Sequence, residues 1–162
     1  MEYTHIVHSF PPVFDERSRI LILGSLPSVL SRKNQFYYGH PQNRFWKVLA
    51  RLWDAPVPES IEEKKAFLLS HGIALWDVVA ECDIAGSSDA SIRNVIPTDL
   101  PKILDTCGIQ ALYANGATAA KIYNRCQRER TGREIVTLPS TSPANAAWSL
   151  DRLCDAWSVL CR

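Results

Sequence analysis

Short apolar runs separated by helical stretches constrain the fold of this chain more than any other feature of its sequence. Segment 18–24 carries a continuous apolar run that Gly24 ends, which is typical of a strand buried on both faces of a parallel sheet. Segments 72–79, 109–114 and 134–138 have the same character. The sequence therefore predicts a sheet of about four strands.

Segments with helical periodicity lie between and after these runs. Helices are predicted at residues 43–53, 61–69, 101–106 and 117–126. A last helix is expected to follow Ser142, which can cap it, with Pro143 in its first position. The apolar face of that helix is expected to comprise Ala147, Leu150, Cys154, Trp157 and Cys161.

This alternation predicts a three-layer α/β/α sandwich around a central, mainly parallel sheet. No repeat or linker divides the chain, so one domain over residues 1–162 is expected. Ligands in such folds bind at the carboxyl ends of the strands. That rule selects the loops that begin at Gly24, Asp77, Asn115 and Pro139, the second of which runs into a polar segment at 86–89.

The composition fits a compact chain without bound groups: hydrophobic residues make up 46% and charged residues 22% of 162 positions. No stretch could cross a membrane and the start lacks a signal peptide, so a cytoplasmic protein with reduced thiols is expected. The five cysteines show no Cys-x-x-Cys spacing, and His5 and His8 fit a flexible terminus better than a shared metal. We expect neither a metal nor an organic cofactor.

Charge decides little about partners. The net charge of +1 neither favours nor excludes a nucleic acid, which needs only a local basic face. An arginine cluster near a predicted loop fits a solvated turn or a phosphate track; it comprises Arg125, Arg128, Arg130 and Arg133. Glycine-rich phosphate motifs and the Gly-x-Ser-x-Gly nucleophile elbow are missing.

Two motifs carry a specific resemblance. Residues 40–46, His-Pro-Gln-Asn-Arg-Phe-Trp, match the His-Pro-x-Asn-Arg-Phe-Trp motif of the mismatch-specific uracil-DNA glycosylases residue for residue. Segment 138–145 is similar to the loop before the last helix in the uracil-DNA glycosylase superfamily. The resemblance implies the fold predicted above and a DNA base-excision activity.

The first motif of the superfamily differs here. Most members carry Asp or Asn as its third residue, to orient the attacking water, but this chain has Leu26. The chain resembles instead the hypoxanthine-DNA glycosylase branch, because it combines Gly-Ser-x-Pro-Ser with Tyr-Tyr-Gly-His-Pro-x-Asn-x-Phe-Trp. In that branch the asparagine of the later motif is held to be catalytic. The resemblance makes Asn43 the catalytic residue.

The chemistry of Asn43 leaves two roles open. It could cap the helix that starts there, or its carbonyl could accept a hydrogen bond from water and aim that water at the sugar carbon. An amide is not a strong base. A dissociative reaction nevertheless needs little nucleophilic push, because an oxocarbenium-like sugar forms first.

The residues expected to bind the base are Ser25, Leu26, Tyr38, Asp77 and Asn115. Tyr38 matches the aromatic residue that stacks on the extruded base in the related enzymes, or else it packs in the core. Backbone N–H groups of Ser25 and Leu26 could hold a carbonyl oxygen of the base. Asp77 could accept the N1–H of hypoxanthine, although an anion would oppose an anionic leaving group, or it could order the adjacent loop.

The residues expected to bind DNA are His40, Arg44, Ser140, Thr141, Ser142, Pro143, Ala144 and Asn145. Residues 141–145 are suited to wedge into the duplex and hold phosphates with hydroxyls, free N–H groups and a helix N-terminus. Ser140 stands where the superfamily has a histidine. An ordinary proline-rich start of a helix is the alternative, and His40 and Arg44 would contact phosphate or order the loop.

The sequence thus predicts a monomeric, monofunctional glycosylase that acts on double-stranded DNA containing a deaminated base, deoxyinosine above all. No lysine occupies a motif position, so Schiff-base lyase chemistry is not expected. Two alternatives stay open: a uracil or mismatched-thymine glycosylase on the same scaffold, and a damaged-DNA or nucleotide-binding module without catalysis.

Overall fold

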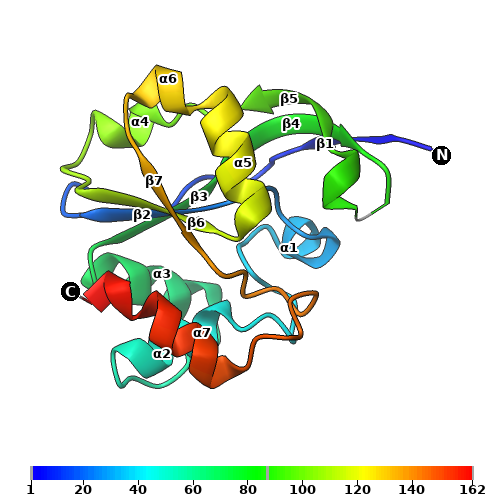
Figure 1. Ribbon diagram of the computed structural model, residues 1–162. Coiled ribbons are helices and arrows are strands. Elements are labelled where there is room, and N and C mark those ends of the chain that lie inside the picture. Colours follow the sequence, from blue (N-terminus) through cyan, green and yellow to red (C-terminus); the bar gives the residue numbers. More distant parts are fainter. Residues whose placement is uncertain (1, 87, 162) are drawn as a thin grey trace.

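A computed structural model describes residues 2–86 and 88–161, so Ser87 of the expected polar loop lies outside the described residues. The centre of the structure is a parallel sheet with the strand order β3-β2-β6-β7 (Figure 1). Its strands are β2 (Ile20–Gly24), β3 (Ile73–Asp77), β6 (Ala111–Asn115) and β7 (Ile135–Leu138). Each coincides with a predicted apolar run, and the prediction of a mainly parallel sheet is confirmed.

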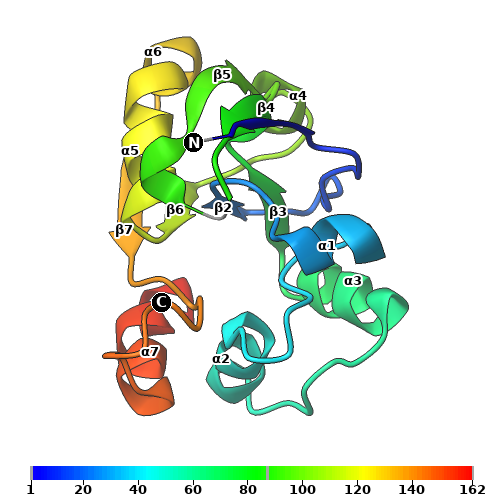
Figure 2. The same ribbon diagram turned by 90° about the vertical axis from the view of Figure 1, so that its right-hand side faces the viewer.

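Alternating side chains of β2 divide the core into two layers. Ile22 faces one apolar cluster, whereas Leu21 and Leu23 face the other, and all three are fully buried. The first cluster is covered by α2 (Phe45–Leu52), α3 (Ile61–Ser70) and α7 (Leu150–Trp157). The second is covered by α4 (Pro101–Leu104) and α5 (Ala117–Cys126). Helices thus lie on both faces of the sheet, as predicted (Figure 2).

A small antiparallel sheet of order β1-β4-β5 extends the second outer layer. Its strands are β1 (Thr4–Val7), β4 (Val79–Ile84) and β5 (Arg93–Pro97), with the 3₁₀ turn η1 (Asp89–Ser91) between the last two. The expectation of a flexible N-terminus is wrong, because Ile6 is buried with Cys82 and Ile84. No strand was predicted at β4, although Glu81 and Asp83 alternate with those two residues in the period-2 pattern typical of a strand.

The short helix α1 (Val29–Asn34) forms where a loop was expected. Its start is capped by the Ser28 hydroxyl, which accepts a hydrogen bond from the Ser31 N–H at 3.1 Å.

The arginine cluster surrounds α6 (Arg128–Thr131), which precedes β7 and so lies at the amino end of the sheet (Figure 1). Arg128 forms an ion pair with Glu134, and the Arg133 guanidinium donates to the Ile109 carbonyl at 2.8 Å. These contacts support the solvated turn rather than the phosphate track.

The last helix begins later than predicted. α7 starts at Leu150 and is capped by Ser149, whose hydroxyl accepts from the Arg152 N–H. The expected cap at Ser142 is wrong, because its hydroxyl accepts from the Ala144 N–H inside a turn. Of the predicted apolar face, Leu150, Cys154 and Trp157 pack in the core, whereas Ala147 and Cys161 are exposed.

All five cysteines are free thiols. Burial raises the pKa of the Cys82 and Cys107 thiols, which keeps both protonated near neutral pH. No helix within the described ranges is long and apolar enough to span a membrane.

Trp157 joins α7 to the loop that follows β7, and its removal should destabilise the fold. The fully buried ring packs edge-on against Phe45, and its Nε1–H donates to the Pro139 carbonyl at 2.9 Å. Trp157→Ala is expected to lower the free energy of unfolding by about 3–5 kcal/mol in urea denaturation. Val136→Ala, at a side chain 49% exposed, is the control and should cost less than about 1 kcal/mol. Equal losses would contradict this account of the core.

Candidate active site

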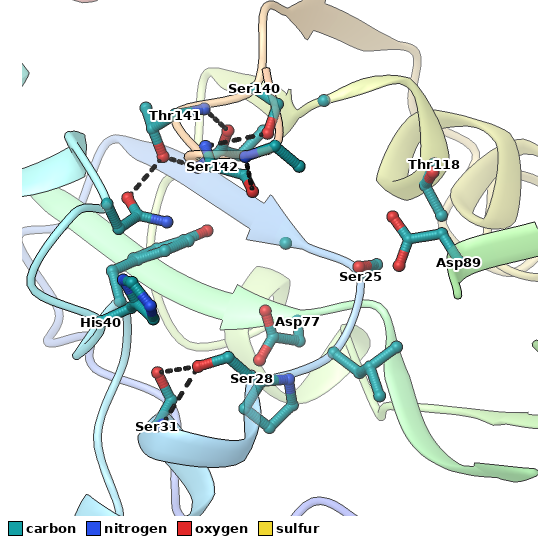
Figure 3. A pocket seen from close by; sticks show the side chains of 18 of the residues that line it. Ser25, Ser28, Ser31, His40, Asp77, Asp89, Thr118, Ser140, Thr141 and Ser142 are labelled. Atoms are coloured by element: carbon teal, nitrogen blue, oxygen red, sulfur yellow. Dashed lines mark hydrogen bonds between the residues drawn. The ribbon is translucent and has the colours of Figure 1, made fainter. Parts of the chain in front are cut away.

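A cavity of about 440 Å³ opens at the carboxyl ends of β2, β3 and β6 (Figure 3). It is lined by the segment after β2, by residues before α2, by Asp77, by Asn115–Thr118 and by Ser140–Ala144. The sequence-predicted loops therefore meet at one rim. Of the predicted site residues, only Arg44 and Asn145 do not line this cavity.

Several residues at the cavity were missed by the sequence analysis: Ser31, Arg32, Asp89 and Thr118. Figure 3 shows Asp89 and Thr118 on one side, near Ser25, and Ser31 on the opposite side, below His40 in the view. Asp89 belongs to the polar segment 86–89, which was recognised only as a loop. Nothing local in the sequence indicates that this loop reaches the end of β2.

Asn43 is held by hydrogen bonds of defined direction. Its Oδ1 accepts from the Phe45 N–H at 2.9 Å and from the Thr141 hydroxyl at 2.8 Å. Asn115 orients that hydroxyl, because Asn115 Oδ1 accepts from the Thr141 N–H and Asn115 Nδ2 donates to Thr141 Oγ1, both at 3.0 Å. If the Asn43 amide were flipped, two donors would face each other, Nδ2 and the Phe45 N–H. The amide oxygen Oδ1 is therefore assigned to the position next to the Phe45 N–H.

This network changes the expected role of Asn43. Both lone pairs of Oδ1 are occupied, so the expectation that this carbonyl accepts a hydrogen bond from water is wrong. Nδ2 makes no hydrogen bond within the described ranges and is the atom left for a ligand. Asn115, expected to bind the base, instead places both its side-chain polar atoms on Thr141.

Tyr38 is held in a strained conformation at the cavity. Its φ of 51° lies in the left-handed region, which costs a bulky residue on the order of 1–3 kcal/mol. One face of its ring stacks on Phe45, with centroids 4.1 Å apart, which leaves the opposite face for a flat ligand. Burial, and then the charge of Asp77, raise the pKa of the Tyr38 hydroxyl, so it stays protonated.

Gly24 forms the floor of the cavity because no side chain fits there. A Cβ at this position would lie 2.4 Å from Asp77 Oδ1 and 2.9 Å from the Tyr38 hydroxyl oxygen. The two side chains thus converge on the end of β2. The Tyr38 hydroxyl is buried without a well-formed hydrogen bond, although Asn115 lies close enough to oppose the rise in its pKa.

Asp77 is paired with a residue that no motif indicated. His8 Nε2 donates to Asp77 Oδ2 at 2.8 Å, and each side chain is only 4% exposed. His8 was missed because the N-terminus was expected to be flexible. His5, three positions earlier, contacts Glu81 and Asp83 at the surface instead, so the two histidines do not share a site. No cluster of three His, Cys, Asp or Glu side chains in the described chain could hold a metal ion.

The backbone N–H groups of Ser25 and Leu26 donate to no acceptor within the described ranges. Both residues line the cavity, so these donors are available to a ligand. The Leu26 side chain packs against the apolar cluster on the α5 side of the sheet. The Leu26 side chain therefore forms part of the cavity wall, while its backbone N–H remains available to a ligand.

The loop over residues 140–145 has fewer free donors than expected. The N–H groups of Thr141, Ser142, Ala144 and Asn145 are all taken by acceptors within the loop or by Asn115. Because α7 starts at Leu150, no helix N-terminus lies in this loop either. The expected phosphate grip by free N–H groups and a helix end is therefore wrong, and hydroxyls remain as polar groups of the loop. The helix starts that line the cavity belong to α1 and α5.

Arg44 orders this loop. Its guanidinium donates to the carbonyls of Ser142 and Asn145, each at 3.1 Å, and to that of Trp148. These bonds support the loop-ordering alternative for Arg44. His40 is exposed at the cavity, where its Nδ1 accepts from the Gln42 N–H at 3.0 Å.

Comparison with known families agrees with this geometry. The family model of the uracil DNA glycosylase superfamily matches residues 11–161, a range that contains the central sheet, the cavity and both motifs. The chain belongs to the uracil-DNA glycosylase superfamily. Within this superfamily, a Methanosarcina acetivorans protein named hypoxanthine DNA glycosylase is 36% identical over 149 residues, covering 91% of this chain and 93% of the relative.

Two further relatives of the superfamily extend the comparison. A protein from Methanosarcina barkeri, also named hypoxanthine DNA glycosylase, is 38% identical over 86 residues, or 52% of this chain and 54% of the relative. A solution NMR structure of a Methanosarcina acetivorans protein described as a uracil DNA glycosylase superposes with a TM-score of 0.78 and 32% identity. That match covers 94% of this chain and 97% of the other.

The loop-ordering role of Arg44 can be tested without DNA. Arg44→Met should raise amide hydrogen exchange in residues 142–148 and lower the free energy of unfolding by about 2–3 kcal/mol, because it removes the charged donor that joins three carbonyls of the loop. Arg51→Met, in the helix α2 that follows Arg44, is the matched control; its partner Asp151 is 87% exposed, so the loss should stay below about 1 kcal/mol. Unchanged exchange together with weaker DNA binding would assign Arg44 to phosphate.

Proposed function

We propose that this chain is a monofunctional DNA glycosylase that hydrolyses the N-glycosidic bond of deoxyinosine in DNA and releases hypoxanthine. The observation that carries the proposal is the convergence of Asn43, Tyr38 and Asp77 on one cavity at the carboxyl edge of the sheet. Membership of the superfamily and the names of two relatives support the same conclusion.

The cavity suits a nucleotide that has been turned out of the duplex. Its volume of about 440 Å³ lies within the roughly 300–1,000 Å³ of pockets that hold small ligands. An enzyme that acts on a base must first extrude it, and the free face of the Tyr38 ring offers a surface for stacking. Ser140, Ser142 and Pro143 line the cavity and are proposed to contact the flanking strand.

The reaction needs stabilisation of the leaving base more than a strong nucleophile. The bond between C1′ and the base nitrogen breaks first, and its electron pair leaves with hypoxanthine. The N–H groups of Ser25 and Leu26 are proposed to hold the base carbonyl, where negative charge collects. A water oxygen then bonds to C1′, and the proton lost from that water passes to the base, which gives free hypoxanthine and an abasic site.

Asn43 is proposed to act as a donor in this step. Its Nδ2–H holds the attacking water by one lone pair of the water oxygen, which leaves the second lone pair free to reach C1′. The bonds from Phe45 and Thr141 to Oδ1 keep the amide in this orientation. A group that only positions water is sufficient when the sugar already has oxocarbenium character.

Base release from defined duplexes tests the activity. Single-turnover reactions with duplexes that contain one deoxyinosine, deoxyuridine, deoxyxanthosine or mismatched thymidine, followed by alkaline cleavage of abasic sites, should rank deoxyinosine first. Strand cleavage should require the alkali, because lyase activity is not expected. A ranking led by deoxyuridine would make the chain a uracil glycosylase, and no release from any duplex would remove the proposal.

Two variants of Asn43 separate its proposed roles. Asn43→Asp keeps an oxygen for Phe45 and Thr141 but replaces the donor with an acceptor, so we expect hypoxanthine release to fall by about 100- to 1,000-fold. Asn43→Ala should lose activity to a similar extent and also about 1 kcal/mol of stability, since it removes the contact to the start of α2.

Gln42→Ala provides the control for both variants, because Gln42 is exposed and does not line the cavity. Its rate should equal that of the wild type. A rate for Asn43→Asp at or above the wild-type rate would show that an acceptor activates the water, and a wild-type rate for Asn43→Ala would remove Asn43 from the mechanism.

A further inference from the structure

The contact between His8 and Asp77 fixes which carboxylate oxygen faces the cavity. Oδ2 accepts from His8 Nε2 at 2.8 Å, while Oδ1 points at Gly24 and has no hydrogen-bond partner within the described ranges. Asp77 lines the cavity and His8 does not, so His8 approaches the carboxylate from behind. The imidazole packs against the rings of Phe10 and Tyr37, with centroids 4.5 and 6.0 Å away.

The contact with His8 also reduces the electrostatic cost of a carboxylate at this site. A buried anion without a partner is costly, and it would repel negative charge on a departing base. The imidazole N–H draws charge toward Oδ2, on the side away from the cavity. Tyr37 and Tyr38 add no charge, because burial, and then the charge of Asp77, raise the pKa of both hydroxyls.

The floor of the cavity thereby places an acceptor beside a donor. Asp77 Oδ1 lies 2.4 Å from the point where a Cβ on Gly24 would sit, and the free N–H of Ser25 belongs to the next residue along the chain. Hypoxanthine and uracil present the complementary edge, a ring N–H next to a carbonyl. Adenine presents the opposite edge, a ring nitrogen acceptor next to an amino group, and would set its nitrogen lone pair against the carboxylate.

We propose that His8 is a positioning residue that holds Asp77 Oδ1 as the acceptor for the ring N–H of the base, so that the cavity accepts lactam bases and rejects adenine. This inference rests on the proposed glycosylase function and adds the element that selects the base. It also explains why a histidine outside both motifs is buried against the end of β3.

Single-turnover kinetics test this role. His8→Phe keeps a ring against Phe10 and Tyr37 but removes the donor, and it should reduce hypoxanthine release by about 10- to 100-fold. His8→Gln supplies an amide N–H and should recover part of the rate. His5→Phe is the matched control on β1, because His5 contacts surface carboxylates, and its rate should equal that of the wild type. A wild-type rate for His8→Phe would overturn the proposal.

A double-mutant cycle shows whether His8 acts through Asp77. In an Asp77→Asn background, His8→Phe should change the rate by less than about 2-fold, because the contact is already altered. Independent, multiplying effects of the two substitutions would mean that His8 serves the fold alone, and would overturn the proposal.

Two further measurements do not require catalytic activity. In ¹⁵N-histidine NMR spectra, the wild type should show a protonated, hydrogen-bonded His8 Nε2 whose resonance shifts in Asp77→Asn; an unprotonated Nε2 would overturn the inference.

If the wild type releases no base, the proposed function fails, and calorimetric titration with free hypoxanthine and adenine decides the inference separately. A preference for hypoxanthine that His8→Phe abolishes would support it, and equal binding would overturn it.

Discussion

The pairing of β2 between β3 and β6 is the constraint on which the site depends. Its register sets Gly24 beside Asp77 and Leu23 beside Ala114, so the chain leaves all three strands at the same edge. A shift of the strand register by one residue would move each buried side chain of β2 to the opposite face of the sheet. The packing of the core therefore fixes the register, and with it the positions of the site residues.

Hydrogen bonds of fixed direction then determine which atoms the loops present. Asn115 orients Thr141, and Thr141 orients Asn43, so an amide N–H rather than a carbonyl is left at the cavity. With the free N–H groups of Ser25 and Leu26, the site offers three backbone and side-chain donors at the cavity. Such preorganised donors suit a reaction limited by departure of the base, and they explain how Leu26 is compatible with the superfamily's chemistry.

The residues that break ordinary packing rules gather at this same place. Tyr38 adopts a left-handed backbone, Gly24 has no space for a Cβ, and Asp77 is a carboxylate buried against His8. The left-handed backbone of Tyr38 and the buried carboxylate are each unfavourable on their own and persist because the surrounding core holds them. Their coincidence at one cavity distinguishes this edge from the amino end of the sheet, where the arginine cluster forms ordinary surface contacts.

The sequence by itself determined the strands of the central sheet, most of the long helices and the motif residues at the cavity, because hydrophobic periodicity and turn chemistry are local properties. Only the tertiary structure decided where Thr4–Val7 pairs, where α7 begins and which atom of Asn43 is free. Ile6 is ordered by Cys82 and Ile84, and the loop before α7 by Arg44. Partners so distant along the chain leave no periodic signal, and so the contact of His8 with Asp77 could be found only in the folded protein.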